Sequence, residues 1–167
     1  MKTLLILRHA KSSWESTDLS DHDRPLNDRG KRDAPQIGRM LLKEGLIPQV
    51  IISSSATRAR STAEKVAKAC GYEGKILVDS SLYASAYTAY LNVLQGQHDR
   101  YDIVMLVGHN PHTEELLEVV TGKMVTMPTC TVAWIKLDIS KWKELNIQTK
   151  GELVNVWRPK ELRLHKQ

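Results

Sequence analysis

Four short apolar runs, separated by segments with helical spacing, organise the first two thirds of the chain. The runs are Thr3–Leu7, Val50–Ile52, Ile76–Val78 and Ile103–Val107, and in each of them the apolar residues are consecutive rather than alternating. Continuous apolar runs of this length are typical of strands that are covered on both faces, as in parallel sheets. The pattern therefore predicts a buried, mostly parallel sheet.

Between these runs, apolar residues recur at every third or fourth position, which is the spacing of an amphipathic helix. Capping residues help to set the boundaries, since Asn favours the start of a helix and Gly its end. We expect helices from the Asn27 cap to Glu44, from Thr57 to Ala69, from Thr88 to Leu94, and from Pro111 to the stop at Gly122.

The last part of the chain has a different pattern. Thr131–Leu137 and Glu152–Trp157 alternate between apolar and polar residues, as half-covered strands do. They are expected to form an antiparallel hairpin that closes one edge of the sheet. Strands that alternate with helices are typical of the α/β class. We therefore predict a single three-layer α/β/α domain over residues 1–167, with a mostly parallel central sheet and an antiparallel C-terminal edge.

Composition narrows the function classes. Hydrophobic residues make up 41% of the chain and charged residues 26%, which is usual for a soluble globular protein. Thr3–Leu7 is too short for a signal peptide or a membrane span, so we expect a cytoplasmic protein with no membrane partner. The net charge of +5 is compatible with a phosphorylated partner. No dense run of basic residues occurs, which disfavours nucleic acid. Cys70 and Cys130 are expected to be reduced core thiols.

Candidate chemistry follows the predicted strands. In an open α/β sheet, ligands bind beyond the carboxyl ends of the strands. Arg8 and His9 follow the first strand, Arg58 comes shortly after the second, and His109 follows the fourth. Each of these residues alone would be an ordinary loop side chain. Together, two arginines and two histidines at one edge of the sheet indicate a functional site, since their joint occurrence there would not be expected by chance.

A site of this composition is best explained by phosphoryl transfer. Arginine guanidinium groups bind phosphate oxygens in a forked geometry, and a neutral imidazole is a competent nucleophile. The hypothesis is that His9 attacks phosphorus and water then hydrolyses the phosphohistidine, while Arg8, Arg58 and His109 hold the equatorial oxygens. A metal site is the alternative use of histidines here, and it could be completed by Asp18, Asp21, His22 and Asp23. The neighbouring arginines would repel a cation, so we predict no metal and no other cofactor.

The same residues resemble the sequence blocks of the histidine phosphatase superfamily, which includes the phosphoglycerate mutases. Within it the chain is most similar to the SixA-like phosphohistidine phosphatases. The resembling blocks, in order, are Leu7–Ala10, Asp23–Leu26 followed by Gly30, Ser53–Ala63, Leu82–Tyr83, Val107–Pro111 and Met127–Thr129. The resemblance implies a phosphoglycerate mutase-like fold and catalytic roles for Arg8, His9, Arg58 and His109. It also implies substrate-binding roles for Arg24 and Asn110.

Three departures from the family pattern bear on mechanism. Ala10 replaces a signature glycine, which is tolerable if the backbone there has a negative φ. Glu15 falls where mutases carry Asn, and it is expected to point away from phosphate. No Glu follows the third predicted strand, where many members carry a general acid, although Asp79 or Asp21 could supply a proton.

The missing acid favours one substrate class. An alkoxide leaving group needs a proton in the transition state, and a general acid that supplies this proton commonly raises the rate about 10²–10⁴-fold. The P–N bond of phosphohistidine is weaker and its nitrogen can be protonated from solvent. We therefore expect a phosphatase acting on a protein phosphohistidine, with phosphate or its mimics bound in the site. The alternatives are a phosphatase for small-molecule phosphomonoesters and, without catalysis, a basic domain that binds phosphate or nucleic acid.

Overall fold

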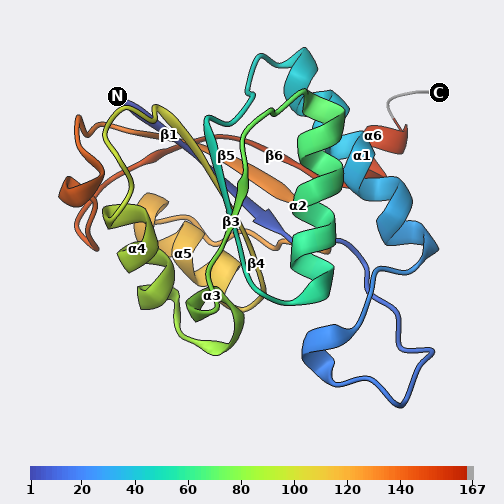
Figure 1. The fold of residues 1–167 in the computed structure, drawn as a ribbon. Helices are drawn as coiled ribbons and strands as arrows, with labels where there is room; N and C mark the ends of the chain where they lie inside the picture. Colours follow the sequence, from blue (N-terminus) through green and yellow to red (C-terminus); the bar gives the residue numbers. More distant parts are fainter. Residues whose placement is uncertain (165–167) are drawn as a thin grey trace.

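A six-stranded sheet in the order β3-β2-β4-β1-β5-β6 forms the middle of the protein (Figure 1). The computed structural model describes residues 1–164. The strands are β1 (Lys2–Arg8), β2 (Val50–Ser53), β3 (Ile76–Val78), β4 (Ile103–Gly108), β5 (Val132–Leu137) and β6 (Glu152–Trp157). All four predicted apolar runs form strands, and each run is followed by the polar segment that sequence analysis singled out.

The first four strands are mutually parallel, so their carboxyl ends meet at one edge of the sheet. β1 pairs with β4 and places Arg8 opposite Gly108, while β2 pairs with β4 and places Ser53 opposite Val107. This register aligns the ends of three strands to within a residue or two. The segments that follow them are therefore neighbours in space, although they lie about fifty residues apart in sequence.

β5 and β6 form the expected antiparallel pair at one edge of the sheet. β5 is antiparallel to both β1 and β6, so it lies inside the sheet, and β6 forms the edge and runs parallel to β1. The connection between β5 and β6 is a long loop that contains a short 3₁₀ helix, Trp142–Glu144. Trp142 is completely buried, which anchors this loop against the core.

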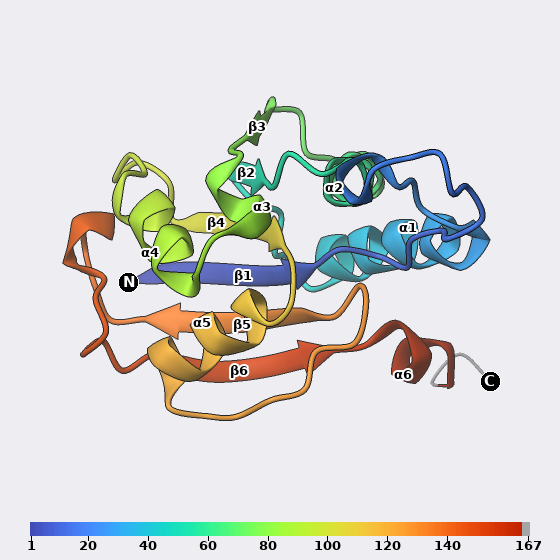
Figure 2. The same ribbon diagram turned by 90° about the horizontal axis from the view of Figure 1, so that it is seen from below.

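Helices cover both faces of the sheet and complete the predicted three layers (Figure 2). On one face lie α1 (Asp28–Lys43) and α2 (Thr57–Cys70), with the short α6 (Pro159–Leu164) beside α1. On the other face lie α3 (Ser81–Ala84), α4 (Tyr87–Gln95) and α5 (His112–Thr121). None of the helices within residues 1–164 is long and apolar enough to cross a bilayer.

Alternation along β1 divides the core between these two faces. Leu4 and Ile6 pack among α4 and α5, whereas Leu5 and Leu7 pack among α1 and α2. All four side chains are fully buried, which explains why the run shows no polar position in the sequence. Cys70 and Cys130 are free, buried thiols, in agreement with the expectation for them.

The helix boundaries follow the predicted caps. The side chain of Asn27 accepts a hydrogen bond of 2.9 Å from the backbone N–H of Gly30, which begins α1. Gly71 and Gly122 end α2 and α5 with φ angles of 83° and 74°, in the left-handed region that glycine enters without steric cost. Sequence analysis missed α3 and α6, because four to six residues are too few to establish a helical period.

Candidate active site

A pocket of about 370 Å³ opens at the carboxyl edge of the parallel strands. All six predicted site residues line it, from loops after three different strands. They are Arg8 at the end of β1 and His9 after it, Arg24 from the segment before α1, Arg58 in the first turn of α2, and His109 and Asn110 after β4.

His9 is held in one orientation by its own backbone. Its Nδ1 lies 2.7 Å from the carbonyl oxygen of Ala10, so Nδ1 must carry the proton and donate it. The lone pair is then on Nε2, which makes no hydrogen bond within residues 1–164. Burial is the main cause that lowers the pKa of His9 to about 4; the Ala10 hydrogen bond opposes this shift, and the neighbouring charges of Arg58 and Arg8 add to it. His9 is therefore a neutral imidazole at physiological pH.

Ala10 is compatible with the site. Cys130 is the one non-glycine residue with a positive φ among those the structure describes, so the backbone at Ala10 needs no glycine. Its methyl group is fully buried, and its N–H donates 2.9 Å to the hydroxyl of Thr62 on α2. This bond ties the residue after His9 to the helix that carries Arg58.

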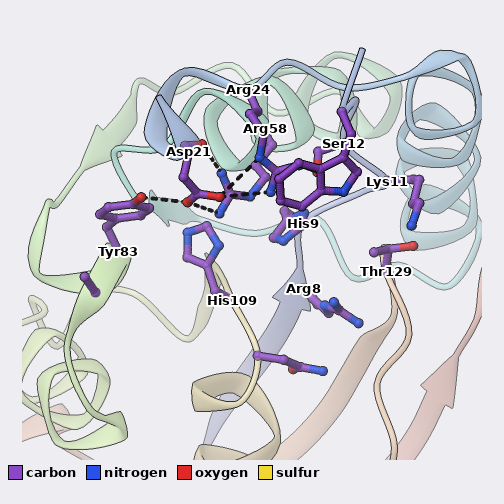
Figure 3. A pocket seen from close by; sticks show the side chains of 13 residues that line it. Arg8, His9, Lys11, Ser12, Asp21, Arg24, Arg58, Tyr83, His109 and Thr129 are labelled. Carbon is purple, nitrogen blue, oxygen red and sulfur yellow. Dashed lines mark hydrogen bonds and ion pairs between the residues drawn. The ribbon is translucent and has the colours of Figure 1, made fainter. Parts of the chain in front are cut away.

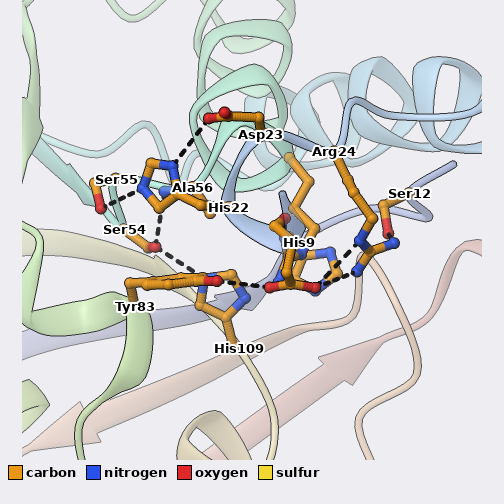
Figure 4. A network of polar contacts seen from close by, with 12 residues as sticks. His9, Ser12, His22, Asp23, Arg24, Ser54, Ser55, Ala56, Tyr83 and His109 are labelled. Atoms are coloured by element: carbon orange, nitrogen blue, oxygen red, sulfur yellow. Dashed lines mark hydrogen bonds and ion pairs between the residues drawn. The ribbon is translucent and has the colours of Figure 1, made fainter. Parts of the chain in front are cut away.

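His109 lies beside His9, with 5.0 Å between the ring centroids. Its Nε2 is 2.8 Å from the hydroxyl of Ser54, and that hydroxyl accepts a 3.2 Å bond from the N–H of Ala56 (Figure 4). The Ser54 hydroxyl has one proton and a second acceptor lone pair, so it can donate to Nε2 of a His109 protonated on Nδ1 or accept from a protonated Nε2. Burial, followed by the charges of His9 and Arg58, lowers the pKa of His109 to about 3.

The three arginines are fixed by different partners. Arg8 donates 3.0 Å to the carbonyl of Met127, and Arg24 donates 2.7 Å to the hydroxyl of Ser12. Arg58 donates 2.7 Å to the backbone carbonyl of Asp21. Arg24 and Arg58 are almost completely buried, yet they remain at the wall of the pocket. Such buried, oriented guanidinium groups suit the forked recognition of a tetrahedral oxyanion.

Asp21 joins two of these arginines (Figure 3). Its carboxylate lies 3.0 Å from Nη2 of Arg58 and 3.1 Å from Nη2 of Arg24, and it accepts a 2.7 Å bond from the hydroxyl of Tyr83. The Tyr83 bond, together with those from Arg58 and Arg24, lowers the pKa of Asp21 to about 2. Asp21 is thus an anion at neutral pH, seated on the cations of the pocket.

Of the two aspartates considered as acids, only Asp21 lines the pocket. The Asp79 carboxylate instead accepts bonds of 2.9 Å from the N–H and 2.6 Å from the hydroxyl of Ser81, so it caps the start of α3. Glu15 is exposed and lines a neighbouring groove rather than the pocket, as expected. Asn110 faces the pocket, and its amide donates 3.0 Å to the carbonyl of Met127.

Sequence analysis did not identify several other lining residues as part of the site. These are Lys11, Ser12, Trp14, Tyr83, Ala84 and Thr129, and Ser54 acts from behind His109. Ser54 directly follows β2, and that position was the available signal for it. Within residues 1–164, no three His, Cys, Asp or Glu side chains are grouped so that they could hold a metal ion. Of the residues considered for that purpose, Asp21 instead contacts Arg24 and Arg58, and His22 contacts Ser55 and Asp23.

Comparison with known proteins agrees with this arrangement. A sequence profile of the histidine phosphatase superfamily (branch 1) matches residues 4–87, which carry Arg8, His9, Arg24 and Arg58. The chain belongs to the histidine phosphatase superfamily. An uncharacterized chloroplastic protein of Arabidopsis thaliana is 35% identical over 152 residues, covering 86% of this chain and 70% of that protein.

Two solved structures of the superfamily share the whole fold. A candidate phosphohistidine phosphatase, SixA, of Agrobacterium tumefaciens is 27% identical, with a TM-score of 0.81 over 95% of this chain and 98% of its own. A protein histidine phosphatase SixA complexed with tungstate is 20% identical, with a TM-score of 0.83 over 96% of this chain and 99% of its own. The α/β fold predicted from the sequence, similar to SixA and to phosphoglycerate mutases, is therefore confirmed.

Proposed function

We propose that this protein is a metal-independent phosphohistidine phosphatase in which His9 is the nucleophile. The observation that carries the proposal is the Nδ1 hydrogen bond of His9 to the carbonyl of Ala10. It fixes the tautomer, so the Nε2 lone pair is available without prior loss of a proton. The lowered pKa of His9, about 4, keeps that lone pair free throughout the physiological range.

The cations around His9 supply the binding energy for the phosphoryl group. Arg8, Arg58 and His109 would hold the three equatorial oxygens, with Arg24 as a further cation and Asn110 beside them. The Nε atoms of Arg8 and Arg58 are buried and have no hydrogen-bond partner among the described residues. A bound oxyanion would give such donors a partner. Tungstate, found in one SixA structure, has the tetrahedral shape of phosphate.

The reaction proceeds in two displacements. Nε2 of His9 forms a bond to phosphorus while the bond from phosphorus to the leaving group breaks. Water then attacks phosphorus from the opposite side, the bond to His9 breaks, phosphate leaves, and the water proton passes to solvent. His9 keeps its Nδ1 proton in both steps, hydrogen-bonded to Ala10. Neutral His109, protonated on Nδ1, can donate to an oxygen as charge develops.

The substrate class follows from the ionisation of Asp21. With a pKa of about 2, Asp21 is deprotonated at neutral pH and cannot give a proton to an alkoxide in the unliganded site. Phosphohistidine does not need this proton from the enzyme. Solvent can protonate its second ring nitrogen, after which the substrate imidazole leaves as a neutral group. The site therefore suits a protein phosphohistidine better than a phosphate ester of an aliphatic alcohol.

The test compares turnover of a histidine-phosphorylated protein with turnover of p-nitrophenyl phosphate. We expect a strong preference for the phosphohistidine and complete loss of turnover in His9→Ala. The matched control is His98→Ala, because His98 is exposed and lies just before β4, at the opposite edge of the sheet. The phosphoenzyme, trapped by quenching at high pH, should be acid-labile and absent in His9→Ala. EDTA should have no effect.

Each contrary result points to a different alternative. Retained turnover in His9→Ala would overturn the nucleophile assignment. Preference for a small phosphate ester would identify a small-molecule phosphatase. Binding of tungstate without turnover of either substrate would indicate a phosphate-binding domain, and steep salt-dependent binding of nucleic acid would favour the nucleic-acid alternative. Strong inhibition by EDTA would restore the metal hypothesis.

A further inference from the structure

Trp14 is an aromatic side chain placed unusually for a tryptophan. It is 70% exposed, and it lines the pocket that contains His9. Full exposure of an indole gains nothing for folding, since tryptophan contributes to stability mainly through the area it buries. Because Trp14 lines the pocket, its exposed ring surface is available to contact a bound ligand.

The indole of Trp14 stacks on an arginine of the pocket. The guanidinium carbon of Arg24 lies 3.5 Å from the centroid of the indole ring, which is a close cation–π stack. Arg24 is itself fixed, because it is only 7% exposed and donates to Ser12 and Asp21. Trp14 is therefore oriented by a buried arginine of the pocket, while most of its own surface remains open to solvent.

A second aromatic ring stands on the other side of the pocket. Tyr83 packs edge-on against His109, with 5.6 Å between the ring centroids, and its hydroxyl is tied to Asp21. Apart from Ala84 and Trp14, the remaining lining side chains are polar or charged. The flat apolar surface of the pocket is therefore concentrated in Trp14 and Tyr83.

The in-line geometry of phosphoryl transfer determines where the leaving group lies relative to these rings. In an in-line displacement the leaving group lies on the side of phosphorus opposite to the nucleophile. With His9 almost completely buried, that side faces outward, towards the exposed residues of the pocket. A leaving group that contains a flat ring would there meet an aromatic side chain, and offset or edge-to-face ring contacts stabilise such pairs beyond simple burial.

We propose that Trp14 forms a stacking seat for an aromatic leaving group and thereby selects phosphoryl donors in which phosphorus is attached to a ring. The imidazole of a phosphohistidine is the protein side chain of that class. This assignment deepens the proposed function and rests on it for the P–N donor. Stacking of Trp14 on the ring of a ligand does not depend on the P–N bond, so it can be tested by binding alone, without catalysis.

The first experiment measures binding by calorimetry. Phenylphosphonate and methylphosphonate carry the same anionic group and differ in the ring, and neither is hydrolysed. The wild-type protein should bind phenylphosphonate more tightly, and Trp14→Ala should reduce this preference by about fivefold to tenfold, as expected for one aromatic contact. Trp14→Phe should retain most of it. Met124→Ala is the control, because Met124 is 84% exposed but lines a different groove.

An equal loss of affinity for both phosphonates in Trp14→Ala would overturn the seat and leave Trp14 as a support for Arg24 alone. An unchanged preference would overturn it as well. The second experiment compares KM for N-phosphoimidazole and phosphoramidate, which share the P–N bond. Trp14→Ala should raise KM selectively for N-phosphoimidazole. If neither compound is a substrate while phosphate esters are, the proposed function fails, and the phosphonate comparison still decides the role of Trp14.

Discussion

The carboxylate of Asp21 lies 3.0 Å from the guanidinium of Arg58, so the unliganded pocket already holds one anion of its own against the arginine that we propose binds phosphate. A substrate phosphoryl group must share Arg58 with this carboxylate. Their like charges repel, and the bond from Tyr83 keeps the carboxylate in place. We therefore expect Asp21 to weaken the binding of doubly charged ligands, including the product phosphate, and so to promote product release.

Replacing Asp21 by Asn should tighten the binding of tungstate and phosphate. We expect about tenfold lower Kd values, the change that removal of one neighbouring like charge commonly produces. The backbone carbonyl of Asp21 still accepts from Arg58, so the arginine keeps a partner. Calorimetry with both anions measures the effect. Asp138→Asn, at an exposed residue after β5, controls for the change in net charge. Weaker anion binding in Asp21→Asn would mean that the carboxylate mainly orders the arginines.

The histidine pair should stay neutral far below the ordinary titration range. Burial lowers the pKa of His9 to about 4 and that of His109 to about 3, against about 6.5 for a histidine in solution. Lowered histidine pKa values mean that protonation, and loss of the nucleophile, begin only as the pH falls below about 5. Nitrogen NMR of the imidazoles should find both rings neutral at pH 5.5, with His9 protonated on Nδ1. A midpoint near 6.5 for either ring would contradict the burial argument.

The same shifts make the folded state acid-sensitive. The unfolded chain takes up protons on these histidines as the pH falls through 6.5, whereas the folded chain resists until about pH 4. Protonation therefore favours unfolding, and stability should decline continuously from pH 6.5 to pH 4, by roughly 1.4 kcal/mol per pH unit for each histidine at the steepest. Urea unfolding at several pH values measures this. The variant His9→Gln should show a shallower decline, and an identical slope would show that other groups dominate.

Ser54 should matter through the proton of His109. In the proposed mechanism its hydroxyl donates to Nε2 and so keeps the proton of the neutral ring on Nδ1. In Ser54→Ala this constraint disappears, and we expect kcat to fall about tenfold, the cost of roughly one buried hydrogen bond, with little change in KM. NMR should detect the alternative tautomer of His109. Ser53→Ala is the matched control, because the Ser53 hydroxyl donates to the backbone of Ser54 and not to His109. Equal effects of the two variants would argue for a packing defect.

Much of the fold was predictable because β1, β2 and β4 are covered on both faces, as continuous apolar runs indicate. The expectation of burial was wrong for β3, which forms an edge of the sheet and leaves Leu77 and Val78 exposed. The position of β5 was not predictable, since alternation shows that a strand is half covered but does not say which neighbour it pairs with. The four residues of α3 complete barely one helical turn, so its start at Ser81 depends on the Asp79 cap rather than on a sequence period.

The site was predictable to the extent that strand ends determine it. Arg8 ends β1, and His9 and His109 directly follow β1 and β4, so the carboxyl ends of parallel strands bring them together as expected. The pairing of Asp21 with Tyr83 could not be predicted, because it joins the segment before α1 to α3, 62 residues away, through side chains alone. The orientation of Trp14 could not be predicted for the same reason, because it depends on stacking with the side chain of Arg24, ten residues later in the chain.

Gly30 contributes both to the fold and to the loop of the candidate site, and its replacement gives a specific stability prediction. A methyl group there would collide with the backbone carbonyl of Lys11, which also accepts the 3.0 Å bond from the N–H of Asn27. Because backbone cannot rotate away as a side chain can, Gly30→Ala should destabilise the protein by about 1–3 kcal/mol. It should also lower kcat, since Lys11 lies two residues after His9. Gly96→Ala is the control, because its new methyl group would meet atoms no closer than 3.6 Å. Urea unfolding measures the loss of stability, and turnover measures the change in kcat. Equal stability of the two variants would contradict the prediction and would mean that the loop after β1 can move to accommodate the methyl group.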